Sequence, residues 1–187
     1  LGYLLVAGRV QAQAGRFMLD NGTPMRFMLN RNRIPLVVGP ELARGRTGSG
    51  QAIVVHAPLN LASLQLAGHA EQTASPGDTR AADFGFLQQV IPDFLGFVGT
   101  PWLAAHAFSL RYVPARLLLA DADTGTARLQ QGSTRVTLIR FDGQDGPLPF
   151  TSFELGDIEL RALFDTGNPG SLQLTAEAHA RLAQAGA

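Results

Sequence analysis

Asp165 is the carboxylate whose neighbours best suit acid–base chemistry. It ends the apolar run 158–164 and is followed directly by Thr166 and Gly167. Glycine lets the chain turn sharply there, and the backbone N–H groups and the hydroxyl of such a turn can hold a carboxylate. Two carboxylates about 3 Å apart cannot both ionise, so they share one proton and can activate a water. We therefore expect Asp165 to act in such a pair, with Thr166 and Gly167 supporting its loop.

The order of elements around this tripeptide is more specific than the tripeptide itself. A hairpin strand precedes it, and a Gly-rich loop, a short apolar strand and a capped helix over 175–182 follow. Asp-Thr-Gly alone arises often by chance. The alternative is an ordinary polar turn at the end of a strand.

Two other segments resemble such a loop but favour simpler interpretations. Asp123-Thr124-Gly125 follows small residues and precedes no turn–strand–helix sequence, which indicates a linker turn. Asp20-Asn21-Gly22 lies between two strand-like runs, and Asn-Gly between such runs is a strong hairpin signal. We therefore predict a β-hairpin turn at 20–22.

Short apolar runs bounded by turn residues predict a mainly β protein. Helices are expected only over 100–106 and 175–182, each beginning with a Thr cap. Such a chain should close into barrels or sandwiches. The predicted strands include 52–55, 108–112, 117–119, 136–139 and 158–164.

Composition excludes several classes of function. The 187 residues contain fifteen basic and fifteen acidic side chains, so a nucleic-acid partner is not indicated. All the basic residues are Arg and Cys is absent, which removes Lys-based and thiol chemistry. The histidines show no ligand-like spacing, so we expect neither a metal nor a cofactor. No apolar run is long enough to span a membrane. The compartment stays open, with a periplasmic or secreted location favoured over a cytoplasmic one.

An internal repeat divides the chain. Residues 25–30 match 160–165 in pattern at an offset of 135 residues, which places Asn30 at the position of Asp165. We therefore expect a first unit over 1–121, a linker over 122–131 and the N-terminal part of a second unit over 132–187.

The segment 150–182 resembles the retropepsin-like aspartic peptidases, which include bacterial members with two lobes in one chain. Gly96-Phe97-Val98-Gly99, followed by a short helix and a closing hairpin, is similar to the end of such a lobe. The resemblance implies closed β-barrel lobes, one complete and one begun. It also implies a substrate-covering flap near 45–50, so that Gly48, Ser49 and Asn168 would contact the substrate.

The activity implied by this resemblance is hydrolysis of peptide bonds in a peptide or protein substrate, by a water that Asp165 activates. The first unit departs from the family pattern, because a neutral Asn30 cannot share a proton. The alternative is therefore an inactive pseudo-peptidase that binds peptides or proteins, and a third possibility is a purely structural β domain. A homodimer could supply the second carboxylate, and a missing C-terminal segment would complete the second lobe.

Overall fold

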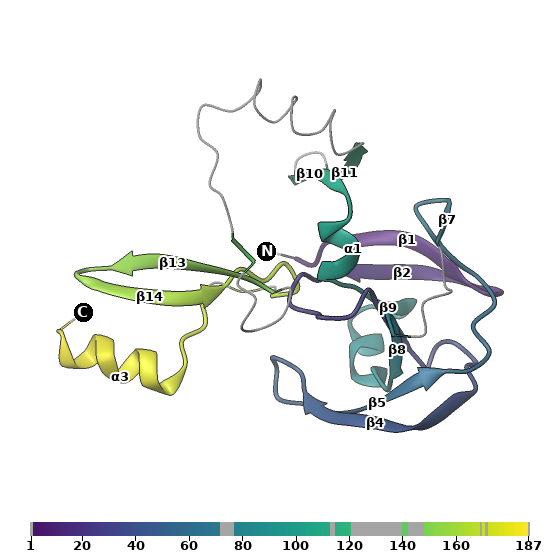
Figure 1. Cartoon of the computed structure of the whole chain (residues 1–187), viewed down its shortest axis with the longest axis horizontal. Coiled ribbons are helices and arrows are strands. Elements are labelled where there is room, and N and C mark those ends of the chain that lie inside the picture. Colours follow the sequence, from purple (N-terminus) through teal and green to yellow (C-terminus); the bar gives the residue numbers. More distant parts are fainter. Residues whose placement is uncertain are drawn as a thin grey trace.

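The computed structural model describes residues 2–71, 77–112, 115–120, 140–141, 148–168, 170 and 172–186. This part of the chain is mainly β, as predicted, and its largest unit is a mixed nine-stranded sheet (Figure 1). The sheet is open between its edge strands, so the predicted closed barrel is not found in the described residues. In spatial order its strands are β4 (Val38–Arg46), β5 (Ala52–Pro58), β8 (Thr79–Ala82), β3 (Phe27–Asn30), β9 (Phe94–Val98), β2 (Gln13–Leu19), β1 (Leu5–Val10), β6 (Leu64–Leu66) and β7 (His69–Glu71).

Two smaller sheets follow along the chain. One is a hairpin of two strands, and the other has three strands, of which the last two lie beside the C-terminal helix (Figure 1). No helix among the described residues is both long and apolar enough to cross a membrane. The predicted linker 122–131 and strand 136–139 lie outside the described residues. The remaining elements are β10 (Ala107–Tyr112), β11 (Ala115–Ala120), β12 (Arg140–Phe141), β13 (Pro149–Leu155), β14 (Ile158–Leu163), η1 (Gly85–Gln89), α1 (Thr100–Ala104) and α3 (Ala176–Gln184).

Strand β9 lies between β2 and β3, although β2 and β3 are neighbours in sequence. It pairs parallel with β2 and antiparallel with β3, so Val98 is in register with both Leu19 and Phe27. Strands β2 and β3 therefore make no hairpin, and the predicted hairpin turn at 20–22 is wrong. The loop between them instead reaches over the end of β9, where the Asp20 N–H donates to the Val98 carbonyl at 2.9 Å.

Two glycines make this insertion possible. A Cβ on Gly96 would lie 2.2 Å from the Met28 carbonyl oxygen, and its φ of +145° is one that side chains rarely adopt. A Cβ on Gly99 would lie 2.0 Å from the Met25 carbonyl oxygen. The Gly-apolar-apolar-Gly pattern thus lets β9 lie tightly against β3 and the loop before it.

Apolar side chains on β2, β3 and β9 alternate between two clusters. Successive strand residues point to opposite faces of a sheet. Phe17, Leu19 and Phe27 belong to one cluster, whereas Met18 and Met28 belong to the other. Because both faces of these strands are covered, the end of β2 and the loop after it have a rigid support. Trp102 of α1 is 1% exposed and belongs to the first cluster, so this helix packs on the core of the sheet.

Local turn and cap signals correctly predicted two features near the C-terminal end of the described residues, the β13–β14 hairpin and the start of α3. Gly156 lies in the two-residue turn that joins β13 to β14, as its hairpin signal indicates. Thr175 caps α3, where its hydroxyl accepts a hydrogen bond from the Ala178 N–H at 3.1 Å. The cap predicted at Thr100 is wrong, because Gly99 occupies that place and the Thr100 hydroxyl donates to the Asn21 carbonyl.

Candidate active site

The Asp20 and Asp165 loops meet beyond the ends of β2 and β14. In each loop the Oδ1 atom of the aspartate accepts a hydrogen bond from the backbone N–H of the glycine two residues later. The bond measures 2.8 Å from Gly22 to Asp20 and 2.7 Å from Gly167 to Asp165. Aspartate commonly bonds its own backbone two residues ahead in tight turns. Both carboxylates are therefore presented in the same way.

The middle residues of the two loops, Asn21 and Thr166, bind each other. The Asn21 N–H donates to Thr166 Oγ1 at 3.1 Å, and the Thr166 N–H donates to Asn21 Oδ1 at 2.7 Å. The Thr166 hydroxyl also donates to the Leu19 carbonyl at 3.0 Å. Since each loop supplies acceptors for the other loop's backbone N–H group, the two loops fix each other's positions.

Gly22 and Gly167 lie against both carboxylates. A Cβ on Gly167 would lie 2.6 Å from Asp20 Oδ1 and 3.1 Å from Asp165 Oδ1. A Cβ on Gly22 would lie 3.0 Å from the Oδ1 atoms of both aspartates. Any side chain at either position would press on the carboxylates. The two glycines therefore allow the acids to face each other closely.

Burial raises the pKa of Asp20 to about 6. Burial is the largest cause of this value. The negative charge of Asp165 and a hydrogen bond to its side chain also contribute to the raised pKa, whereas hydrogen bonds from Thr23 and Gly22 lower it. A carboxyl group with this pKa holds its proton through the mildly acidic range. Asp20 can therefore hold the proton that shared acid–base chemistry requires on one member of such a pair.

Replacing Asp20 with Asn should make the fold more stable at neutral pH but not at acidic pH. The folded-state pKa lies above the unfolded value of 3.8, so ionised Asp20 costs stability. That cost is absent below pH 3.8, grows up to about 6 and is full above it. We expect a gain on the order of 2 kcal/mol near neutral pH and none near about pH 3.5, measured by urea denaturation.

The exposed turn residue Asp157 provides the control for this measurement. Asp157→Asn removes a carboxyl group from the turn between β13 and β14, where residue 157 is exposed. This variant shows what the loss of an exposed carboxyl group alone does to stability over the same pH range. A stability gain for Asp20→Asn that is equally large at acidic pH would contradict the raised pKa.

Thr23 and Thr100 fix the Asp20 loop by hydrogen bonds. The Thr23 hydroxyl donates to Asp20 Oδ2 at 2.6 Å. The Thr100 N–H donates to the Thr23 carbonyl at 3.0 Å, and the Thr100 hydroxyl donates to the Asn21 carbonyl at 2.5 Å. Helix α1 thus connects the sheet to the Asp20 loop, which explains why a hydroxyl residue follows Gly99.

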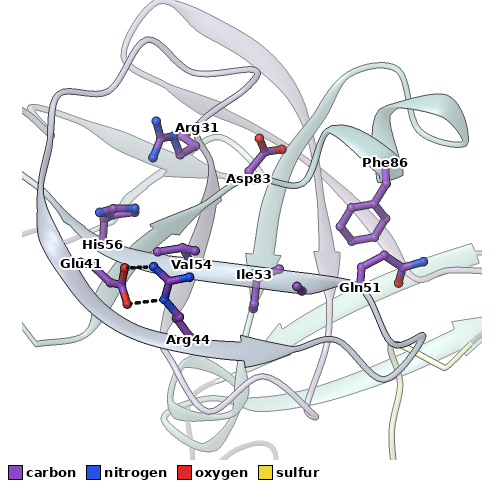
Figure 2. A pocket seen from close by; sticks show the side chains of 10 residues that line it. Arg31, Glu41, Arg44, Gln51, Ile53, Val54, His56, Asp83 and Phe86 are labelled. Carbon is purple, nitrogen blue, oxygen red and sulfur yellow. Dashed lines mark hydrogen bonds and ion pairs between the residues drawn. The ribbon is translucent and has the colours of Figure 1, made fainter.

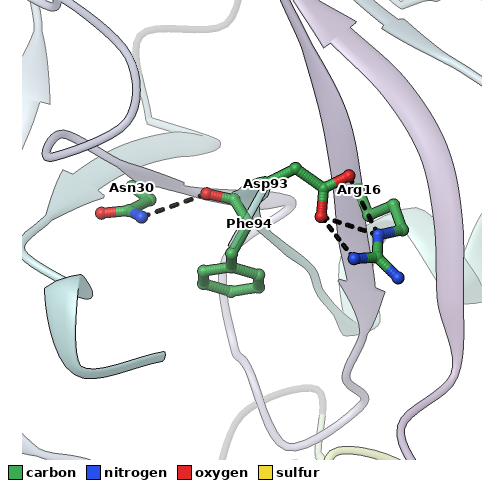
Figure 3. Close-up of polar contacts among 4 residues, drawn as sticks. All are labelled: Arg16, Asn30, Asp93 and Phe94. Carbon is green, nitrogen blue, oxygen red and sulfur yellow. Dashed lines mark hydrogen bonds and ion pairs between the residues drawn. The ribbon is translucent and has the colours of Figure 1, made fainter. Parts of the chain in front are cut away.

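Asn30 does not occupy the position opposite Asp165 that the predicted repeat gave it. It lies in β3, fully buried, and its Nδ2 donates to the Phe94 carbonyl at 3.1 Å (Figure 3). Its Oδ1 accepts from the Phe84 N–H at 3.2 Å. Asn30 therefore joins β3 to β9 and to the segment after β8, and Asp20 is the residue that faces Asp165. The nearby Asp93 side chain binds Arg16 in the same view (Figure 3).

The residues predicted to contact substrate lie at two places. Asn168 belongs to the Asp165 loop, where its N–H donates to the Asp165 carbonyl and its Oδ1 accepts from the Gly170 N–H. Gly48 and Ser49 are exposed at the tip of the β4–β5 hairpin, the predicted flap. The linker turn predicted at 123–125 lies outside the described residues.

A cavity of about 630 Å³ lies beside the β4–β5 hairpin (Figure 2). Arg31 and Asp83, which follow β3 and β8, line it together with Phe86 and residues of the hairpin. The Asp20 loop lies at the other end of β3, roughly 10 Å away along the strand. The cavity is therefore separate from the paired carboxylates, and neither aspartate loop contributes to its lining.

The described residues hold no group of three or more His, Cys, Asp or Glu side chains placed to bind a metal ion. Asp20 and Asp165 do not belong to such a group. Their contacts come from glycine N–H groups and the Thr23 hydroxyl, and these donors suit carboxylate oxygens.

The sequence does contain a signal for Asp20, at an offset ten residues longer than the one that aligns 25–30 with 160–165. At an offset of 145 residues, Leu-Asp-Asn-Gly-Thr-Pro (19–24) aligns with Phe-Asp-Thr-Gly-Asn-Pro (164–169). The apolar residue, the aspartate, the glycine and the proline occupy the same positions in both segments. The strong hairpin signal of Asn-Gly concealed this match, because it accounts for the same residues locally.

No protein-family model matches this chain, and no curated protein matches it at a significant level. The geometry of the two aspartate loops is therefore the main support for a function.

Proposed function

We propose that this protein is an aspartic-type peptidase in which Asp20 and Asp165 together activate a water against a peptide bond. The observation that supports this most is the mutual arrangement of two Asp-X-Gly loops. Each loop bonds its own carboxylate to its glycine N–H, and the loops bind each other through Asn21 and Thr166.

The chemistry follows from one proton shared by two acids. Asp165, ionised, takes a proton from the water while the oxygen of that water attacks the carbonyl carbon of the substrate. Asp20, protonated, donates a hydrogen bond to the carbonyl oxygen, which becomes a hydroxyl group as the tetrahedral intermediate forms. Asp165 then gives its proton to the amide nitrogen, and one hydroxyl group of the intermediate returns a proton to Asp20. The C–N bond breaks, which releases an acid and an amine. The raised pKa of Asp20 suits this residue to the role of proton donor.

Retropepsin-like architecture is the finer fold assignment that we propose. Strand β9 lies between β2 and β3 and ends against the aspartate loop, and the β4–β5 hairpin extends as a flap would. In this assignment Gly48, Ser49 and Asn168 contact an extended peptide or protein substrate. The alternative hypothesis of an inactive pseudo-peptidase was based on Asn30 facing Asp165. Because Asp20 is the residue near Asp165, that hypothesis no longer has this basis.

The direct test is cleavage of a peptide mixture across pH, followed by mass spectrometry. We expect turnover at mildly acidic pH and a tenfold fall per pH unit above about 6, as Asp20 loses its proton. Products formed in H₂¹⁸O should carry one heavy oxygen in each new carboxylate after a single turnover. Pepstatin should inhibit the reaction.

Hydroxylamine separates this mechanism from acyl transfer to a side chain. Direct attack by water forms no acyl-enzyme, so hydroxamate products should be absent. Hydroxamate formation, or turnover that pepstatin leaves unchanged, would reject the proposal.

A further inference from the structure

The second unit leaves open a strand position that is filled in the first. Strand β2, which leads to Asp20, pairs antiparallel with β1 on one side and parallel with β9 on the other. Strand β14, which leads to Asp165, pairs antiparallel with β13. Among the described residues no strand pairs with its other edge. Open edges of this kind are templates for a further strand.

Apolar side chains are exposed where the first unit buries their counterparts. Phe164 is 51% exposed, whereas Leu19, which precedes Asp20 in the same way, is 2% exposed. Leu172 is 50% exposed, and its counterpart Phe27 is fully buried. This difference in exposure follows from β9, which lies beside both strands of the first unit. Its residue Val98 is in register with both Leu19 and Phe27.

The segment 172–174 corresponds to β3 but forms no strand. Strand β3 pairs with β8 and β9 and not with β2. In this arrangement β3 is connected to β2, the strand that leads to the aspartate, through β9. Leu174 is 38% exposed, although its counterpart Leu29 is fully buried. The unpaired state of 172–174 and the open edge of β14 thus have the same cause.

We propose that the slot between β14 and residues 172–174 binds an extended polypeptide segment of the Gly-apolar-apolar-Gly type. The segment would pair parallel with β14, and its apolar side chains would cover Phe164 and Leu172. We name this position the β14 slot. It is defined by the free edge of β14 together with Phe164, Leu172 and Leu174.

The chemistry of the segment follows from what β9 supplies in the first unit. Glycines are needed at the positions of Gly96 and Gly99, because a Cβ there would meet backbone at 2.2 and 2.0 Å. A hydroxyl residue is needed next, because the Thr100 hydroxyl binds the carbonyl of the residue after Asp20. In the second unit that carbonyl belongs to Thr166. A bound segment would therefore also secure the Asp165 loop.

The probe is a synthetic peptide with the sequence of residues 92–104, which contains β9 and α1. It carries a fluorescent label, and anisotropy reports its binding to the full chain with the Asp20→Asn substitution, which prevents cleavage. We expect saturable binding, weakened at least tenfold when the peptide carries Gly96→Val. Hydrogen exchange of β14 amides should slow on binding, while that of β1 stays unchanged.

Variants of the chain locate the binding. Phe164→Ser should weaken binding at least tenfold, and because Phe164 is exposed the fold should survive, which circular dichroism checks. Leu155→Ser changes another exposed residue, at the turn end of β13, and should leave binding unchanged. Equal binding of the Gly96→Val peptide, or no saturable binding, would overturn the β14 slot.

Self-association would also overturn it. If sedimentation shows dimers that Phe164→Ser abolishes and the peptide does not displace, then a second copy covers this surface instead. All these readouts are independent of catalysis. A chain without peptidase activity can still bind the peptide, and an active one can fail to bind it.

Discussion

Asp20→Asn should abolish peptide hydrolysis as completely as Asp165→Asn, with each rate at least about 10³-fold below that of the parent chain. Each acid has a separate role, one as base and one as proton donor, so loss of either removes the shared proton. The double variant should be no slower than either single variant, because groups that act as a unit are not additive. Rates are measured with one cleaved peptide near about pH 5.

Two further variants separate this dyad from the arrangement that the sequence alone favours. Asp123→Asn alters the other Asp-Thr-Gly and should leave the rate unchanged. Asn30→Asp would create an acid pair if residue 30 faced Asp165. Because Asn30 is fully buried and its amide donates to the Phe94 carbonyl, we expect a loss of stability of about 3 kcal/mol and no gain in rate. Full activity in Asp20→Asn would refute the pair.

Gly167→Ala should lower turnover by about 10²-fold or more while the fold persists. The added Cβ would lie 2.6 Å from Asp20 Oδ1 and 2.7 Å from its Cγ, far inside normal contact. The carboxylates must therefore separate, and misplacement of a catalytic group by about 1 Å can cost this much. Peptide cleavage gives the rate, and urea denaturation shows that the chain remains folded.

Gly170→Ala is the matched control in the same loop. Its Cβ would come no nearer than 3.3 Å, to the Asn168 side chain, and residue 170 is exposed. We expect a rate within about twofold of the parent chain. If Gly167→Ala is equally harmless, then the two carboxylates do not work at the separation that this geometry requires.

The two aspartate loops differ in how they are supported. The Asp20 loop is held by Thr23, by Thr100 and by the end of β9. The Asp165 loop is held by its own turn and by Asn21. The hydrogen bonds between Asn21 and Thr166 therefore connect the Asp165 loop to the Asp20 loop, which has more contacts to the rest of the chain. Occupation of the β14 slot would give the second loop the support that β9 gives the first.

Local patterns in the sequence were enough to predict several elements around Asp165. The Asp165-Thr166-Gly167 turn, the β13–β14 hairpin and the Thr175 cap all involve residues only a few positions apart. Their geometry depends on turn and cap chemistry that short segments carry by themselves. The mainly β character follows in the same way from short apolar runs between turn residues.

Only the tertiary structure decided that Asp20, and not Asn30, is the partner of Asp165. Asn-Gly after an apolar strand has the same local signature in a hairpin as in the loop seen at 20–22. The choice is made by β9, which enters between β2 and β3, and by Thr100, which binds the Asn21 carbonyl across 79 residues of sequence. Strand pairing between distant segments depends on which edges and apolar faces remain to be covered. No short window of sequence contains that information.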